Sequence, residues 1–80
     1  MNIQILFFGI TTDLIGNSKI NFSLEKAISV NDFKTKLKEV YPQLQNLDSY
    51  AIAVNESYAD NNLLLSENDV VAIIPPVSGG

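Results

Sequence analysis

Two stretches of the chain are apolar at nearly every position and predict strands that lie in the middle of a sheet. The first covers residues 3–8, and the second is the β-branched run of residues 70–74. One face of the first strand could instead contact a partner. Residues 19–24 alternate polar and apolar side chains, as a half-exposed strand does, and they follow the turn signal Gly16-Asn17-Ser18. The first strand and residues 19–24 therefore predict a hairpin.

Apolar residues between positions 30 and 44 recur at intervals of three and four and predict the main helix. Ser29 and Asp32 resemble a capping box at its start, and Pro42 ends it near Tyr41. The polar side of this helix carries three lysines, which we interpret as a solvated face: Lys34, Lys36 and Lys38.

The remaining pattern predicts a third strand over residues 50–54, closed by the polar pair Asn55-Glu56. After a turn at residues 60–62, the three leucines of residues 63–65 form a short strand or a crossover. The order of elements is that of an α+β, ubiquitin-like β-grasp fold, in which one main helix crosses one face of a mixed sheet. We expect a single domain over residues 1–80, with residues 3–8 and 70–74 as central neighbours and residues 75–80 as a projecting tail.

Composition excludes several classes of function. There is no Cys and no His, so thiol nucleophiles, imidazole bases and the usual zinc ligands are missing, and we expect no metal site and no independent catalysis. Five lysines against nine carboxylates give a net charge of −4, which argues against nucleic acid. No apolar stretch approaches the roughly 20 residues that span a bilayer, and residues 1–10 lack the positive flank of a secretory signal. We expect no membrane partner and a cytoplasmic location.

The tail residues predict chemistry at the main-chain terminus. Their order is Pro75, Pro76, Val77, Ser78, Gly79 and Gly80. The two prolines end sheet pairing and favour an extended chain, and the six residues could reach roughly 20 Å. Glycine lets an unhindered carboxylate enter a narrow slot. A carboxylate is a poor electrophile and needs activation, most simply as a mixed anhydride with a nucleotide phosphate, so the chain would be a substrate and not a catalyst.

Three segments carry a resemblance to the small subunit of molybdopterin synthase, a ubiquitin-like sulfur-carrier family. They are Ile5 to Gly9, Ala53-Val54-Asn55, and Asp69 to Gly80, of which the closing Pro-Pro-Val-Ser-Gly-Gly is the most specific. The resemblance implies that an E1-like adenylyltransferase uses ATP and Mg to adenylate Gly80. A sulfur donor such as a persulfide enzyme then displaces AMP to give a thiocarboxylate. This group would donate sulfur to the pterin precursor of the molybdenum cofactor.

The resemblance also implies which partners and surfaces are used. The large synthase subunit would supply the catalytic side chains, and two small subunits would sit at opposite ends of a large-subunit dimer, forming a heterotetramer. No cofactor would be bound permanently by this chain. An apolar surface beside the tail would bind the partner through Phe8, Tyr58 and Ile74. Tyr58 departs from the aliphatic residue expected there, but it lies in a polar stretch where an aromatic has little reason to be core, and Tyr is enriched at interfaces.

Three other functions fit the same residues. A sulfur carrier for thiamine or another pathway shares the fold, the diglycine and the adenylation step. A ubiquitin-like protein modifier would join Gly80 to a lysine amine of a target. A plain binding module would leave the tail idle, and truncation after Ser78 would then cost no activity.

Overall fold

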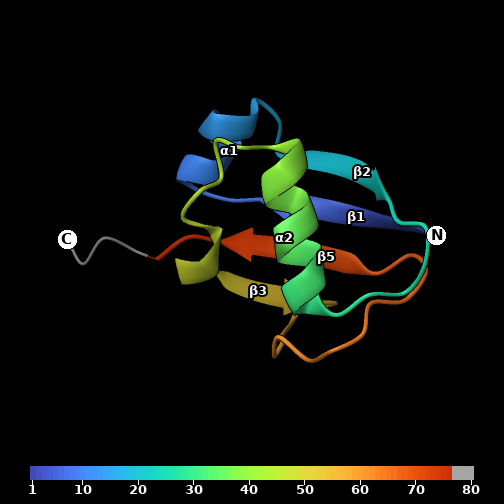
Figure 1. Cartoon of the computed structure of the whole chain (residues 1–80). Coiled ribbons are helices and arrows are strands. Elements are labelled where there is room, and N and C mark those ends of the chain that lie inside the picture. The colour runs from blue at the N-terminus through green and yellow to red at the C-terminus, as the bar shows by residue number, and fades with distance from the viewer. Residues whose placement is uncertain (77–80) are drawn as a thin grey trace.

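A mixed sheet and the helix that crosses one of its faces dominate the computed structural model, which describes residues 1–76 (Figure 1). The strands are β1 (Asn2–Phe7), β2 (Lys19–Ser23), β3 (Ala51–Val54), β4 (Ser57–Tyr58) and β5 (Val70–Ile74). The helices are α1 (Ile10–Ile15), α2 (Val30–Val40) and the 3₁₀ turn η1 (Leu47–Ser49). The strand order across the sheet is β2-β1-β5-β3-β4.

The two most apolar strands lie side by side in the centre of this sheet, as predicted. β1 and β5 run parallel, with Gln4 opposite Val70 and Phe7 opposite Ile73. β5 is also paired with β3 on its other edge, so both of its edges are hydrogen-bonded. The predicted hairpin between β1 and β2 is confirmed as an antiparallel pair. Parallel β1 and β5 leave the sheet at the same end, and the position of that end matters for the site described below.

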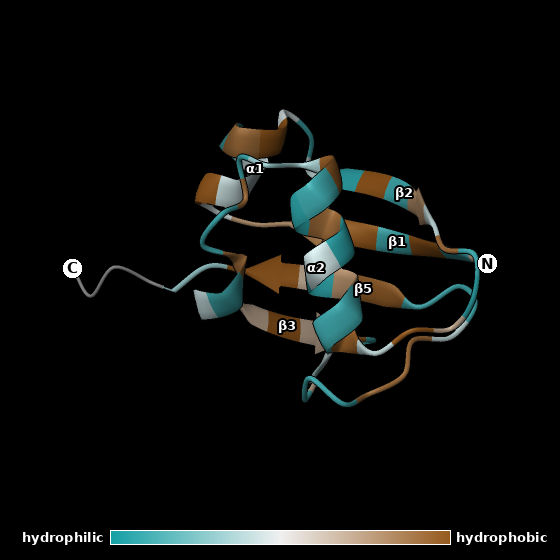
Figure 2. Cartoon of the chain, in the orientation of Figure 1, coloured by the Kyte–Doolittle hydropathy of each residue, from teal (hydrophilic) through white to brown (hydrophobic). Residues whose placement is uncertain are grey.

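Helix α2 begins and ends where the sequence predicted. The side chain of Ser29 accepts a hydrogen bond of 3.1 Å from the backbone N–H of Asp32, and the N–H of Tyr41 closes the last turn on the carbonyl of Leu37. The helix packs its apolar stripe on the sheet. There the rings of Phe33 and Phe22 meet edge to face, with 6.0 Å between the ring centroids. Figure 2 shows the resulting contrast between the hydrophilic outer side of α2 and the hydrophobic strands β1 and β5 beneath it.

Residues 63–65, predicted as a short strand or a crossover, are a crossover, and the fourth strand forms before them. Residues 57–58 form β4, and in the leucine segment Leu64 makes only a single bridge with Ser29. The reason is that Asn55 and Glu56 both take left-handed backbone angles, with φ of 52° and 73°. Two successive residues of this kind make a tight hairpin turn, so the chain reverses directly after β3.

Lys34 was expected on the solvated face of α2, but it is buried. Its side chain is only 8% exposed, and its Nζ donates a hydrogen bond of 3.0 Å to Oδ1 of Asn61. The loop after β4 covers this side of the helix, since the N–H of Asn31 donates to the carbonyl of Asn61 and the N–H of Leu65 donates to the carbonyl of Ile28. The lysine amine therefore anchors a loop in place of facing water.

Two short helical segments were not predicted. α1 has six residues and connects β1 to β2, and η1 has three and precedes β3. Both are shorter than a window over which helical periodicity can be recognised. None of the helices within residues 1–76 is long and apolar enough to cross a membrane.

Candidate functional site

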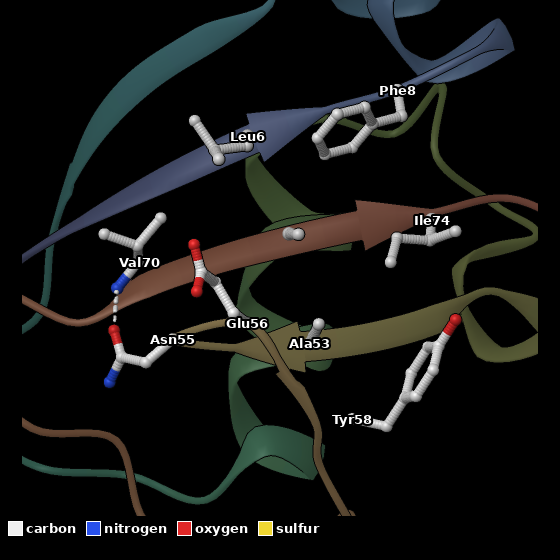
Figure 3. Close-up of a pocket in the computed structure, with 9 residues that line it drawn as sticks. Leu6, Phe8, Ala53, Asn55, Glu56, Tyr58, Val70 and Ile74 are labelled. Carbon is white, nitrogen blue, oxygen red and sulfur yellow. Dashed lines mark hydrogen bonds between the residues drawn. The ribbon is translucent and has the colours of Figure 1, made fainter.

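The sheet face opposite α2 carries a shallow apolar hollow of about 640 Å³. It spans the four strands β1, β5, β3 and β4, and Figure 3 shows its side chains rising from these strands and from the residues that directly follow β1 and β3. The residues that line it are Leu6, Phe8, Ala53, Asn55, Glu56, Tyr58, Val70, Ala72 and Ile74.

Strand register explains why this face is hollow. Leu6 lies opposite Ala72, Ala72 opposite Ala53, and Ala53 opposite Tyr58, so one row of side chains crosses the four strands. Side chains of directly opposed residues stand on the same face of a sheet. Two methyl groups therefore form the floor, and the larger side chains of Leu6 and Tyr58 form the two rims.

The three predicted interface residues are brought together at one end of this hollow. Phe8 is 48% exposed and Tyr58 is 79% exposed, while Ile74 is half-buried. Figure 3 shows all three on the same side of the sheet, with the Tyr58 ring reaching toward Ile74. Large apolar side chains left exposed and contiguous are typical of binding surfaces. Their contact with a partner remains a prediction.

The other end of the hollow is polar. Oδ1 of Asn55 accepts a hydrogen bond of 3.0 Å from the N–H of Val70 (Figure 3). Its Nδ2 donates one of 2.9 Å to Oδ1 of Asp69. The Asn55 side chain thus ties the β3–β4 turn to the start of β5. Glu56 extends its carboxylate over β5, and no lysine is among the lining residues. The hollow is therefore apolar with a negative group at its border.

The β1–α1 corner beside the hollow is held by a threonine that sequence reasoning missed. The hydroxyl of Thr11 is fully buried, accepts a hydrogen bond of 3.0 Å from the N–H of Phe8 and donates one of 2.6 Å to the carbonyl of Phe8. The hydroxyl of Thr12 donates to the carbonyl of Phe7 at 3.0 Å. Nothing in the sequence singled out these threonines, because their role depends on where β1 ends.

Gly9 and Pro75 meet at the same corner. Gly9 has φ 57° and ψ −134°, and a Cβ built on it would lie 3.2 Å from Cγ of Pro75. Pro75 is half-buried and Pro76 is exposed. The predicted tail residues Val77, Ser78, Gly79 and Gly80 lie outside the described residues. The described chain thus leaves β5 directly beside the hollow.

Charges elsewhere do not form a second site in the described chain. Nζ of Lys38 lies 2.9 Å from Oδ2 of Asp48, and this hydrogen bond and charge, aided by the charge of Lys34, hold the pKa of Asp48 below its ordinary value of 3.8. The pair joins α2 to η1. Within residues 1–76, no three acidic side chains are grouped as a metal ion would need.

The fold and the hollow together define a class of protein, the ubiquitin-like β-grasp domains. The crystal structure of SAMP1 from Haloferax volcanii superposes on this chain with a TM-score of 0.87. The match covers 100% of this chain and 100% of SAMP1. Its identity to this chain is 20%, so the likeness shows the fold alone. The predicted fold class is confirmed.

The chain belongs to the ThiS family, whose model matches residues 5–80. The molybdopterin synthase sulfur carrier subunit of Dictyostelium discoideum is 39% identical over 96% of this chain and 94% of its own length. In a protein-protein complex of subunits 1 and 2 of the molybdopterin-converting factor from Helicobacter pylori, one chain matches this one at 27% identity. That match covers 100% of this chain and 100% of the matching chain, with a TM-score of 0.71. The predicted resemblance to this family of sulfur carriers is confirmed.

Proposed function

We propose that this protein is the sulfur carrier subunit of a molybdopterin synthase. The observation that carries the proposal is the end-to-end relation to a molybdopterin synthase sulfur carrier subunit, 39% identical over 96% of the chain. The family match extends to Gly80, so the part of the chain that would react is included in it. On this proposal the carboxylate of Gly80 is the functional group, and the folded domain presents it to partner enzymes.

The hollow serves as the docking surface for the large subunit. Its alanine floor and bulky rims leave space for an apolar side chain, and Phe8, Tyr58 and Ile74 add exposed apolar contact area at one end. The carboxylate of Glu56 at its border favours a partner that places a lysine or arginine there. The complex of subunits 1 and 2 from Helicobacter pylori supports a partner of this kind. Two such pairs would form the heterotetramer.

Docking and delivery are linked because the same strand serves both. Val70, Ala72 and Ile74 of β5 line the hollow, and Pro75 follows at once. A partner bound on the hollow is therefore next to the point where the tail begins. From there, six residues can reach roughly 20 Å into an active site of the partner.

The chemistry takes place at the terminal carboxyl group in two steps. An E1-like adenylyltransferase joins the Gly80 carboxylate to the α-phosphate of Mg-bound ATP and releases pyrophosphate. A sulfur donor then attacks the acyl carbon. With hydrosulfide as donor, a C–S bond forms, the C–O bond to AMP breaks, and a thiocarboxylate results. A persulfide enzyme would first give an acyl disulfide, which a thiol cleaves to the same product. The large subunit would use this sulfur on the pterin precursor.

The test is the intact mass of the purified chain before and after incubation with an E1-like activating enzyme, Mg-ATP and sulfide. We expect a mass change equal to one oxygen replaced by one sulfur, with a matched variant lacking Gly80 remaining unchanged. Addition of the large subunit and the pterin precursor should then restore the original mass. No mass change with an enzyme that activates its own carrier would contradict the proposal.

The same assay distinguishes the other functions. A thiocarboxylate that is consumed by a thiazole-forming enzyme, and not by the large subunit, would indicate a thiamine pathway. Conjugates to lysine amines of other proteins that vanish without Gly80 would indicate a protein modifier. Full activity of the chain truncated after Ser78 would indicate a binding module whose tail is idle.

A further inference from the structure

We propose that Gly9 is a positioning residue that sets the direction in which the tail leaves the sheet, through its contact with Pro75. This inference rests on the proposed function, because the direction matters only if Gly80 reacts. It begins from the register of the two parallel strands. Phe7 lies opposite Ile73, and continuing that register by two positions places Gly9 beside Pro75.

Backbone pairing cannot hold the chain at this point, because proline has no N–H to donate. The contact between Gly9 and Pro75 takes the place of that pairing. A Cβ on Gly9 would lie 3.2 Å from Cγ of Pro75, so the proline ring packs directly on the bare Cα of the glycine. Even one methyl group there would force the ring to move.

Both sides of this contact are rigid. Gly9 has φ 57° and ψ −134°, a conformation that is essentially restricted to glycine, and it is fixed by the hydrogen bonds of Thr11 to Phe8 on the residue before it. On the other side, the ring of Pro75 fixes its own φ, and Pro76 restricts Pro75 to extended conformations. A displacement of the Pro75 ring is therefore passed to the backbone that follows, because side-chain rotation cannot absorb it.

The test uses Gly9→Ala and Pro75→Ala as substrates for the activating enzyme, with Gly16→Ala as matched control. Gly16 also has a positive φ, of 83°, but a Cβ there meets nothing within 4 Å, so this variant carries backbone strain without a contact. We expect Gly9→Ala and Pro75→Ala to lower kcat for thiocarboxylate formation by about 10-fold or more, because small errors in position are costly to reaction rates. Their KM should stay near the wild-type value, since each substitution changes only the contact where the tail begins and leaves the rest of the folded surface as it is.

The split between kcat and KM separates positioning from stability. This chain is the substrate, so a partly unfolded variant presents less competent substrate, which raises the apparent KM and leaves kcat unchanged. We expect Gly16→Ala to raise the apparent KM at most and to leave kcat unchanged. In the double variant Gly9→Ala with Pro75→Ala, the ring that the new Cβ meets is gone, so the loss in kcat should be smaller than the product of the two single losses. An unchanged kcat in Gly9→Ala, or a strictly multiplicative double variant, would overturn the proposal.

A measurement without any enzyme tests the contact directly. Nuclear Overhauser effects between the Gly9 Hα protons and the Pro75 ring protons are expected in the wild-type chain, and their absence would overturn the proposal whatever the activating enzyme does. A wild-type chain that shows these effects but is not activated by the enzyme would instead count against the proposed function.

Discussion

At the scale of single residues, the sheet face opposite α2 carries large apolar side chains that are exposed to solvent and therefore add little to the stability of the fold. Tyr58 is the extreme case, with 79% of its surface exposed on a two-residue strand. Its ring contributes little to the core but forms one rim of the hollow. A residue of this kind can be changed with little effect on folding, which makes it a direct probe of docking.

Tyr58→Asp is expected to weaken binding to the large subunit by about 10-fold or more, because it replaces an aromatic rim with a charge that must be desolvated on docking. The free energy of unfolding should change by no more than about 0.5 kcal/mol, as for other surface substitutions. Calorimetric titration and urea denaturation measure the two quantities. The matched control is Leu64→Asp, since Leu64 is 63% exposed but does not line the hollow. Equal affinities of the two variants would remove Tyr58 from the interface.

Thr11→Val tests the buried hydroxyl at the β1–α1 corner. The substitution keeps the shape but leaves the N–H of Phe8 without the partner it has in the structure. We expect a loss of about 1–3 kcal/mol in the free energy of unfolding, the usual cost of a buried polar group that loses its hydrogen bond. Thr12→Val is the control, because Thr12 is less buried and makes one hydrogen bond there. A Thr11→Val loss no larger than the Thr12→Val loss in urea denaturation would show that the hydroxyl is not needed.

At the scale of elements, the hollow is a property of strand register and not of any one strand. Its floor is the pair Ala72 and Ala53, contributed by β5 and β3, which lie opposite one another across a strand boundary. Neither residue attracts notice in its own segment, where alanine is simply one more apolar position. The functional consequence of these small side chains exists only when the strands pair in this register.

Ala72→Leu should fill the floor of the hollow and weaken binding to the large subunit by about 10-fold or more, because the partner side chain loses its space. Folding should be little affected, since the added atoms point away from the core. Ala27→Leu is the matched control. Ala27 is exposed in the loop between β2 and α2 and does not line the hollow. Affinity for the large subunit measured by calorimetry should fall for Ala72→Leu only, and equal affinities would exclude insertion of a partner side chain.

The ion pair between α2 and η1 predicts a specific dependence of stability on pH. The pKa of Asp48 is lowered in the folded chain, chiefly by the hydrogen bond from Lys38. Its stabilising contribution is therefore fully present above the ordinary value of 3.8 and is lost as pH falls through the lower folded pKa. Near neutral pH, the wild-type chain should unfold at a slightly higher urea concentration than Asp48→Asn. In acid, the unfolding midpoints of the two proteins should become equal.

High salt should also reduce that difference, because Asp48 is exposed and its pairing is screened. Glu39→Gln is the control for removing one negative charge from this part of the molecule, since Glu39 makes no ion pair within residues 1–76. A difference between wild type and Asp48→Asn that persists undiminished in acid would contradict the assigned pairing.

At the scale of the whole molecule, the central strand of the sheet also carries the tail. β5 is hydrogen-bonded on both edges and places Val71 and Ile73 fully in the core, directly before Pro75. A rigid base of this kind is suited to holding a reacting terminus at a defined point. The two outer strands, β2 and β4, each have one edge that no other strand within residues 1–76 pairs with.

Hydrogen exchange should therefore be slowest at the β5 amides that pair with β1 and β3, and fastest in β4 and α1. Central strands open only with global unfolding, whereas short peripheral elements open locally. Exchange of the backbone amides followed by NMR gives this ranking directly. Protection of α1 equal to that of β5 would contradict it.

Much of this organisation was determined by the sequence itself. The side chains of residues 70–74 are all apolar, so they are buried on both faces only in a central strand. The apolar spacing after Ser29 specified α2, and the polar pair Asn55-Glu56 marked the end of β3. The prolines at 75 and 76 likewise predicted the end of sheet pairing, because they lack an N–H. Each of these features is local, so neighbouring residues contain enough information to predict it.

Tertiary structure alone decided the rest, because those features depend on residues that are distant in sequence and become neighbours through strand pairing. Phe8, Tyr58 and Ile74 could be predicted as interface candidates, but their common hollow over two alanines follows from the register of four strands. Lys34 is buried because a loop from beyond β4 covers it. Gly9 meets Pro75 because β1 and β5 run parallel and end together, which places the start of the tail at a single point beside the docking surface.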